Sequence, residues 1–104
     1  MERRSFSIRR VTPAELRRLF NDGGYWNRAK SGKLTEKLYR EGHPSPSKSG
    51  EPPCTRSQIL AYFDENGRQV AIVHQYLRKD GSLGASGRPD PKKLFHDDVL
   101  YLLE

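Results

Sequence analysis

The sequence predicts an α+β domain in which N-terminal helices pack on an antiparallel β-meander of three to five strands. Three observations predict this class: a helix-start signal at residue 12, a run of prolines and serines over 43–53, and hairpin turn signals after that run. A length of 104 residues suits one domain. Its expected parts are a basic helical part over 1–42, a Pro/Ser-rich loop over 43–57 and an antiparallel sheet over 58–104.

The first helix is predicted by the tetrapeptide Thr12-Pro13-Ala14-Glu15. The Thr12 hydroxyl suits the N-cap, where it accepts a hydrogen bond from a free backbone N–H. Proline suits the first helical position, and a glutamate three residues after the cap completes a capping box. A pair of glycines then ends the pattern, so we expect a helix over 13–21.

The rest of the N-terminal part carries weaker signals. Residues 5–11 indicate a short extended segment. Tyr25 and Trp26 are expected in a loop, where they either pack under the first helix or stack on nucleic-acid bases. The apolar spacing over 33–40 predicts a second helix. The prolines, serines and glycine of the 43–53 run exclude regular structure there.

Turn signals organise the C-terminal part. Asn66-Gly67 predicts a hairpin with a two-residue loop, because both residues tolerate positive φ. Asp80-Gly81 predicts a second hairpin, a loop follows over 84–91, and a pair of aspartates at 97–98 predicts the last turn. In the first hairpin, the expected cross-strand pairs are Phe63 with Val70, Ala61 with Ile72, and Ile59 with His74.

Positive charge is concentrated in the first half of the chain. The net charge is +6, and residues 1–57 hold 13 Lys/Arg against 6 Asp/Glu, whereas residues 58–104 hold 6 against 7. One-sided charge of this kind is typical of a protein that binds a polyanion, although a solvated basic surface also keeps a protein soluble. The candidate nucleic-acid contacts are Arg9, Arg10, Arg17, Arg18, Arg28, Lys30, Arg88, Lys92 and Lys93.

Several function classes are excluded at this stage. No apolar run of about 18 residues predicts a membrane span, and the charged N-terminus is not a secretory signal. The single cysteine, Cys54, excludes an internal disulfide and a cysteine-based zinc site, and it favours a reducing, cytoplasmic setting. The histidines lack metal-ligand spacing, and no phosphate-binding loop or nucleophile elbow is present, so we expect no metal and no cofactor.

One strand carries a candidate catalytic set. His74, Tyr76 and Arg78 alternate along it, so their side chains are expected on one face. His74 suits a general acid or base near neutral pH, and Arg78 suits the stabilisation of charge developing on a phosphate. Tyr76 suits proton donation or stacking on a base. The alternative is structural, with these side chains packing at the edge of the core.

The expected order of elements is helices, then an antiparallel meander with the segment 74–78 (HQYLR) on a strand, and a basic loop. This order resembles that of small metal-independent ribonuclease toxins with barnase-like or RelE-like folds. The resemblance covers mainly residues 58–104. It implies RNA cleavage without a metal, with His74, Tyr76 and Arg78 on the sheet as the catalytic residues.

The sequence therefore predicts a small basic protein that binds nucleic acid, RNA rather than DNA, with RNA cleavage as an extension of that function. A second hypothesis is a non-catalytic inhibitor or adaptor that binds an acidic or nucleic-acid-binding surface of a partner protein, as small phage-type inhibitors do. A third is a structural domain of a mobile-element system without activity of its own.

Overall fold

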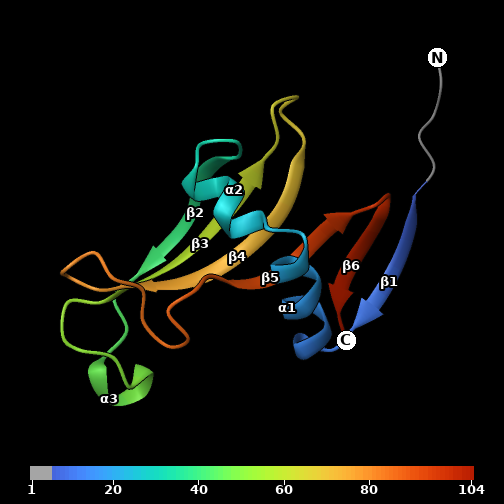
Figure 1. The fold of residues 1–104 in the computed structure, drawn as a ribbon. Helices are drawn as coiled ribbons and strands as arrows, with labels where there is room; N and C mark the ends of the chain where they lie inside the picture. The colour runs from blue at the N-terminus through green and yellow to red at the C-terminus, as the bar shows by residue number, and fades with distance from the viewer. Residues whose placement is uncertain (1–5) are drawn as a thin grey trace.

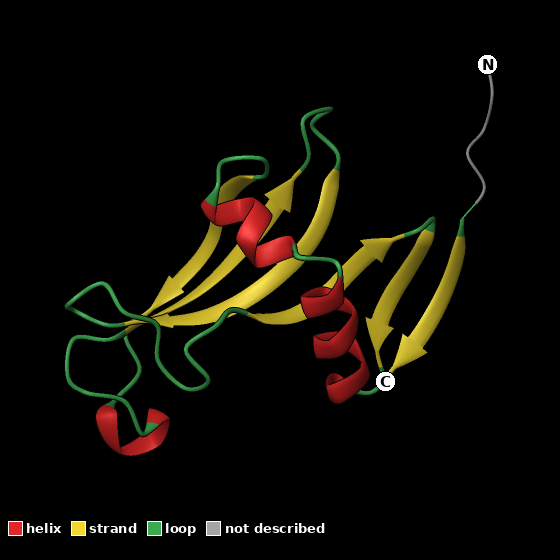
Figure 2. Ribbon diagram, in the orientation of Figure 1, coloured by secondary structure: helices red, strands yellow, loops and turns green. Residues whose placement is uncertain are grey.

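The computed structural model describes residues 6–104 as an α+β fold built on one six-stranded mixed sheet. Helices α1 and α2 lie over one face of the sheet, and the short α3 lies at the end of the molecule opposite β1 and β6 (Figures 1 and 2). The elements in chain order are β1 (Ser7–Val11), α1 (Pro13–Asp22), α2 (Tyr25–Lys30), β2 (Thr35–Gly42), α3 (Pro46–Ser49), β3 (Arg56–Phe63), β4 (Gln69–Leu77), β5 (Asp90–His96) and β6 (Val99–Leu103).

The strand order in the sheet is β1-β6-β5-β4-β3-β2. Strands β2 to β6 form antiparallel neighbours, but β1 pairs parallel with β6, with Ser7 opposite Val99 and Val11 opposite Leu103. The expectation of three to five strands in an antiparallel meander is therefore wrong in strand number and in the direction of β1. The parallel pair joins the two ends of the chain, and no local pattern encodes such a pairing.

Helix α1 begins as the sequence predicts. The Thr12 hydroxyl accepts a hydrogen bond from the Glu15 backbone N–H at 3.2 Å, and Pro13 occupies the first turn. Leu16 and Phe20 point from this helix into the core, where they are 0% and 1% exposed. The Thr12 cap and the apolar spacing thus fix both the start of the helix and the face that it buries.

Two predictions for the segment after α1 are wrong. Tyr25 and Trp26 lie in the helix α2 rather than in a loop, and the expected helix over 33–40 is mostly the strand β2. The helical spacing rests on Leu34, Leu38 and Tyr39, but Leu34 is buried just before β2, whereas Leu38 and Tyr39 are exposed in it. Pairing with β3 decides in favour of the strand.

The Pro/Ser-rich run contains one helical turn that the sequence argument excluded. Pro46 stands in the first turn of α3, where its missing N–H costs nothing, and Gly50 ends the turn with φ +71°. The rest of the run is irregular, as predicted.

The β3–β4 hairpin keeps most of its predicted register. Ile59 pairs with His74 and Ala61 with Ile72, but Phe63 pairs with Gln69 instead of Val70. The turn is one residue longer than predicted, because the Asp64 N–H bonds to the Arg68 carbonyl. A bulge between Tyr62 and Phe63 absorbs this extra residue, so the pairs farther from the turn are unchanged.

The other two turns differ in what they build. Asp97 and Asp98 have φ of +49° and +60°, so these two aspartates form the tight turn between β5 and β6, as predicted. The Asp80-Gly81 turn supports only a single bridge between Leu77 and Leu83, and no further strand forms before β5. The long connection that results lies beside the end of β4.

The core lies between the helices and one face of the sheet. Tyr62, Val73 and Leu94 are each 0% exposed there, and Tyr25 is buried with them, which confirms the core interpretation of Tyr25. Trp26 packs against this cluster but is only half-buried, so part of its surface remains accessible. No described helix covers the other face. No helix among residues 6–104 is long and apolar enough to cross a membrane.

Candidate functional site

A polar pocket of about 280 Å³ lies where β4 extends past the first residue of β5. Asp90 pairs with His74, so the last residues of β4 have no partner in β5, and the connection over 78–89 passes beside them instead. We call this cavity the β5 pocket. It is lined by Arg17, His74, Gln75, Tyr76, Gly84, Ala85, Ser86, Arg88 and Asp90.

His74 sits in the β5 pocket with a defined set of neighbours. Its Nε2 lies 2.7 Å from the Ser57 hydroxyl, and its ring meets the Tyr76 ring edge to face at 4.8 Å between centroids. Burial lowers the pKa of His74, the charge of Lys92 lowers it further, and Asp90 acts in the opposite direction. The imidazole is therefore held in its neutral form at neutral pH, and a neutral imidazole is able to accept a proton.

Cations surround the single carboxylate of the pocket. Lys92 Nζ lies 2.9 Å from Asp90 Oδ2, and an Arg17 nitrogen lies 3.7 Å from Asp90 Oδ1. Among the described residues, Arg88 has no carboxylate within 4.0 Å. Lys92 is outside the lining, but the two arginines that line the pocket outnumber its one carboxylate, which leaves the pocket suited to an anion.

An aromatic side chain adjoins the pocket through Arg88. The Arg88 guanidinium carbon lies 5.5 Å from the centroid of the half-buried Trp26 ring, and the Lys30 ammonium lies 3.9 Å from the same centroid. Both are cation–π distances. The structure thus brings Trp26 and Lys30 from α2 next to the predicted binding residue Arg88.

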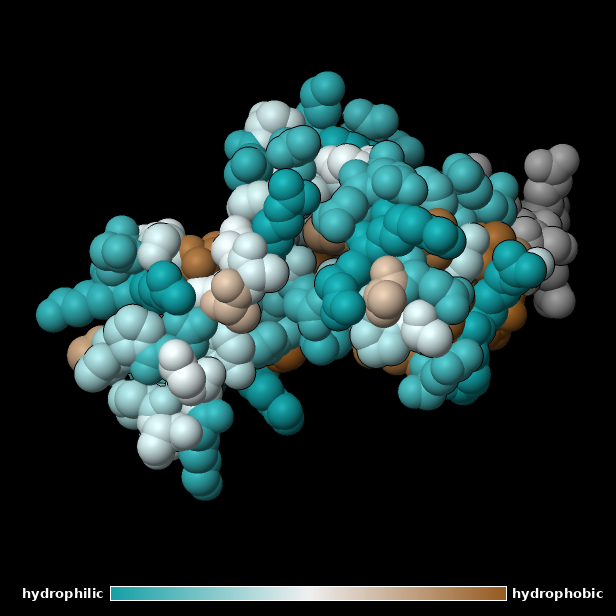
Figure 3. Space-filling view, turned by 60° about the horizontal axis from the view of Figure 1, so that its bottom comes forward, coloured by the Kyte–Doolittle hydropathy of each residue, from teal (hydrophilic) through white to brown (hydrophobic). Residues whose placement is uncertain are grey.

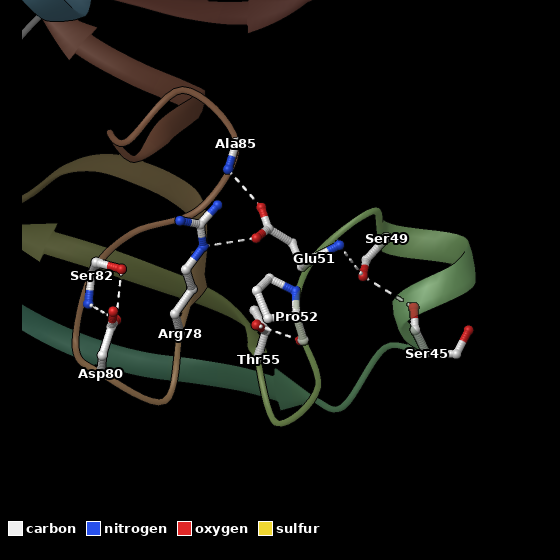
Figure 4. A network of polar contacts seen from close by, with 9 residues as sticks. All are labelled: Ser45, Ser49, Glu51, Pro52, Thr55, Arg78, Asp80, Ser82 and Ala85. Atoms are coloured by element: carbon white, nitrogen blue, oxygen red, sulfur yellow. Dashed lines mark hydrogen bonds and ion pairs between the residues drawn. The ribbon is translucent and has the colours of Figure 1, made fainter.

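Arg78 is not in the pocket, although the sequence argument grouped it with His74 and Tyr76. Its Nε donates a hydrogen bond to Glu51 Oε2 at 2.9 Å, and the Ala85 N–H donates to Glu51 Oε1 at 2.6 Å (Figure 4). Both bonds lower the pKa of Glu51, and the side chain is 5% exposed. Arg78 and Glu51 together hold the connection that carries Ser86 and Arg88.

Glu51 is a residue that the sequence analysis did not single out. The sequence feature that could have indicated it is Gly84, whose lack of a side chain permits close approach of another group. A Cβ at Gly84 would overlap the Glu51 carboxylate. The small residue therefore makes room for this buried carboxylate, which in turn fixes one wall of the β5 pocket.

The remaining predicted binding residues lie elsewhere. Arg9, Arg10 and Arg18 line a second hollow, of about 290 Å³, between β1 and α1. The Arg28 guanidinium lies 5.0 Å from the Tyr25 ring centroid, and Lys93 lines a third hollow that is described below. Helix α1 thus separates two basic hollows, with Arg17 directed to one and Arg18 to the other.

Among residues 6–104, no three His, Cys, Asp or Glu side chains gather as a metal site would require, and Cys54 is exposed. Comparison of the chain with protein-family models, with curated proteins and with solved structures found no match.

Proposed function

We propose that the protein binds single-stranded nucleic acid, RNA in preference to DNA, with a phosphate group in the β5 pocket. The observation that carries the proposal is the meeting of Arg17 and Arg88 with His74 and Tyr76 around one cavity, beside the Trp26 ring. Guanidinium groups bind phosphates through paired hydrogen bonds. Aromatic rings beside cations suit stacking with bases, which is a common mode of single-strand binding.

The preference for RNA rests on the neutral groups of the pocket. Ser86, with its hydroxyl group, and His74, with its neutral imidazole, line the same cavity as the two arginines. Both are able to exchange a hydrogen bond with a 2′-hydroxyl, which DNA lacks. The second basic hollow, formed by Arg9, Arg10 and Arg18 on the other side of α1, would hold a more distant part of the same backbone.

The test is fluorescence anisotropy with a labelled RNA of about 12 nucleotides, and with DNA of the same sequence. We expect Arg88→Ala to weaken RNA binding about tenfold. We also expect it to reduce, by about one, the slope of the logarithm of the binding constant against the logarithm of salt concentration. Lys48→Ala is the matched control, because Lys48 is exposed on α3 and outside the pocket. Equal binding by the two variants would overturn the proposal.

RNA cleavage is the catalytic extension of the same site. If Nε2 of His74 donates its proton to the Ser57 oxygen, Nδ1 keeps a lone pair and serves as the base. It takes the proton of the 2′-hydroxyl, whose oxygen then attacks the adjacent phosphorus. The bond to the 5′-oxygen breaks, and that oxygen takes a proton from the Tyr76 phenol. Arg88 stabilises the charge on the phosphate, a role that Arg78 leaves open because it is bound to Glu51.

This extension is tested by incubating RNA with the purified protein in the presence of EDTA. We expect fragments that end in a 2′,3′-cyclic phosphate, and a loss of at least about a hundredfold in rate for His74→Ala. Intact RNA at high protein concentration would exclude cleavage. It would not affect the binding proposal, which the anisotropy experiment tests separately.

A further inference from the structure

A second, apolar hollow lies on the face of the sheet that the helices leave open. It has a volume of about 320 Å³, and we call it the open-face groove. Leu94 packs in the core beneath α1, so its neighbour Phe95 points to the opposite face of β5. The apolar lining is formed by Phe6, Val70, Ala71, Phe95 and Leu100.

From this groove we infer a docking site for a segment of a partner protein that carries apolar side chains flanked by aspartates or glutamates. The first argument is the composition of β6, which is apolar at every position from Val99 to Leu103. A strand with one face in water normally alternates apolar and polar residues, whereas a strand covered on both faces is apolar throughout. β6 therefore has the sequence of a strand that is covered on both faces of the sheet.

The second argument is the exposure of apolar side chains at this end of the sheet. Phe6 is 53% exposed and Ile8 is 61% exposed, and the Phe6 ring meets the Phe95 ring edge to face at 5.8 Å. The space-filling view shows hydrophobic surface at its right-hand end, while most of the remaining surface is hydrophilic (Figure 3). Exposed apolar surface of this kind marks an interaction site.

The third argument identifies the charge of the partner. Arg68 and Lys93 line the groove, and neither has a carboxylate within 4.0 Å among the described residues. An acidic segment would supply those carboxylates. A second copy of this chain is disfavoured, because it has a net charge of +6 and would bring the same two cations into the interface.

The open-face groove is separate from the proposed RNA site. Its lining shares no residue with the lining of the β5 pocket. The two partners can therefore bind to one molecule at the same time, and the docking site does not depend on the function proposed for the pocket.

The experiment compares two synthetic peptides of about 12 residues that share the same leucines and phenylalanines. One peptide carries Asp and Glu between them, and the other carries Lys and Arg. Lys93→Glu is expected to lower the affinity for the acidic peptide at least tenfold and to allow the basic peptide to bind. Lys48→Glu makes the same change in net charge on α3, and it is expected to leave both affinities within about twofold of the wild-type protein.

Phe6→Ser tests the apolar part of the groove without a core defect, because Phe6 precedes β1 and is more than half exposed. We expect it to lower the affinity for the acidic peptide about tenfold, while the denaturation midpoint of the protein stays unchanged. Equal binding of the two peptides by the wild-type protein, or indifference of the acidic peptide to Lys93→Glu, would overturn the inference. So would self-association of the protein that Phe6→Ser abolishes in sedimentation, because a second copy would then occupy the groove.

Discussion

The β5 pocket and the open-face groove are built in different ways within one sheet. Most of the groove is formed by regular strands, whose side chains alternate between the two faces, together with Phe6 just before β1 and Arg68 just before β4. The pocket forms where β4 has lost its partner strand, and one of its walls is a connection held by the Glu51 carboxylate. The comparison teaches that one wall of the polar site depends on a buried contact with a long connection, whereas the apolar site rests mainly on paired strands.

Leu94→Ala is expected to have the largest effect, because it removes the residue that underlies both sites. Leu94 is 0% exposed beneath α1, which carries Arg17 of the pocket, and its neighbours Lys93 and Phe95 line the groove. We expect a loss of about 2–5 kcal/mol in the free energy of unfolding in urea.

Leu100→Ala provides the matched comparison, because Leu100 is only half-buried on the open face. Its expected cost is about 1 kcal/mol, since part of the side chain is already in water. Equal costs at the two positions would mean that the open face is as well covered as the helix face.

Gly84→Ala is expected to damage the pocket and spare the groove. The new Cβ would overlap the Glu51 carboxylate, so the connection must shift, at a cost of about 1–3 kcal/mol. We expect weaker RNA binding but unchanged affinity for the acidic peptide. Equal loss of both affinities would contradict a local role.

A double variant separates this steric effect from a loss of fold. Glu51→Ala removes the carboxylate that the methyl group added by Gly84→Ala would meet. In a thermodynamic cycle, the combined cost of Glu51→Ala and Gly84→Ala is therefore expected to be smaller than the sum of the single costs. Additive costs would show that the overlap is not what makes Gly84 necessary.

Acid is expected to weaken the pocket wall selectively. Hydrogen bonds from Arg78 and Ala85 lower the pKa of Glu51 below its ordinary value of 4.5. A carboxyl group with a lowered pKa in the folded state stabilises the protein above pH 4.5, and this contribution disappears as the pH falls through the folded-state pKa. Urea midpoints measured across that range should therefore fall less steeply for Glu51→Gln than for the wild-type protein. Identical slopes would show that the carboxylate is not held as described.

Tyr62→Phe is expected to have the smallest effect and the opposite sign. The Tyr62 hydroxyl is buried without a hydrogen-bond partner among the described residues, and burial raises the pKa of this phenol. Removing the unpaired hydroxyl should increase the free energy of unfolding by about 1 kcal/mol. It should leave the affinities for RNA and for the acidic peptide unchanged. A loss of stability would show that the hydroxyl has a partner in solution.

The sequence by itself determined the features that rest on local hydrogen bonds and spacing. The Thr12 cap fixes the start of α1, and the aspartates at 97–98 fix the last turn. The Asn66-Gly67 signal locates the β3–β4 turn, and the predicted pairing of Ile59 with His74 is confirmed because a bulge compensates for the longer loop. It also placed His74 and Tyr76 on one strand, where they line one pocket.

Only the tertiary structure decided the features that join distant segments. β1 pairs with β6 across the length of the chain, β2 is a strand because β3 is there to pair with it, and Arg78 is bound to Glu51 instead of facing the pocket. In each case the local pattern permits more than one outcome. The choice depends on which partner the rest of the fold brings within hydrogen-bonding distance, and a single sequence does not encode that partner in any local signal.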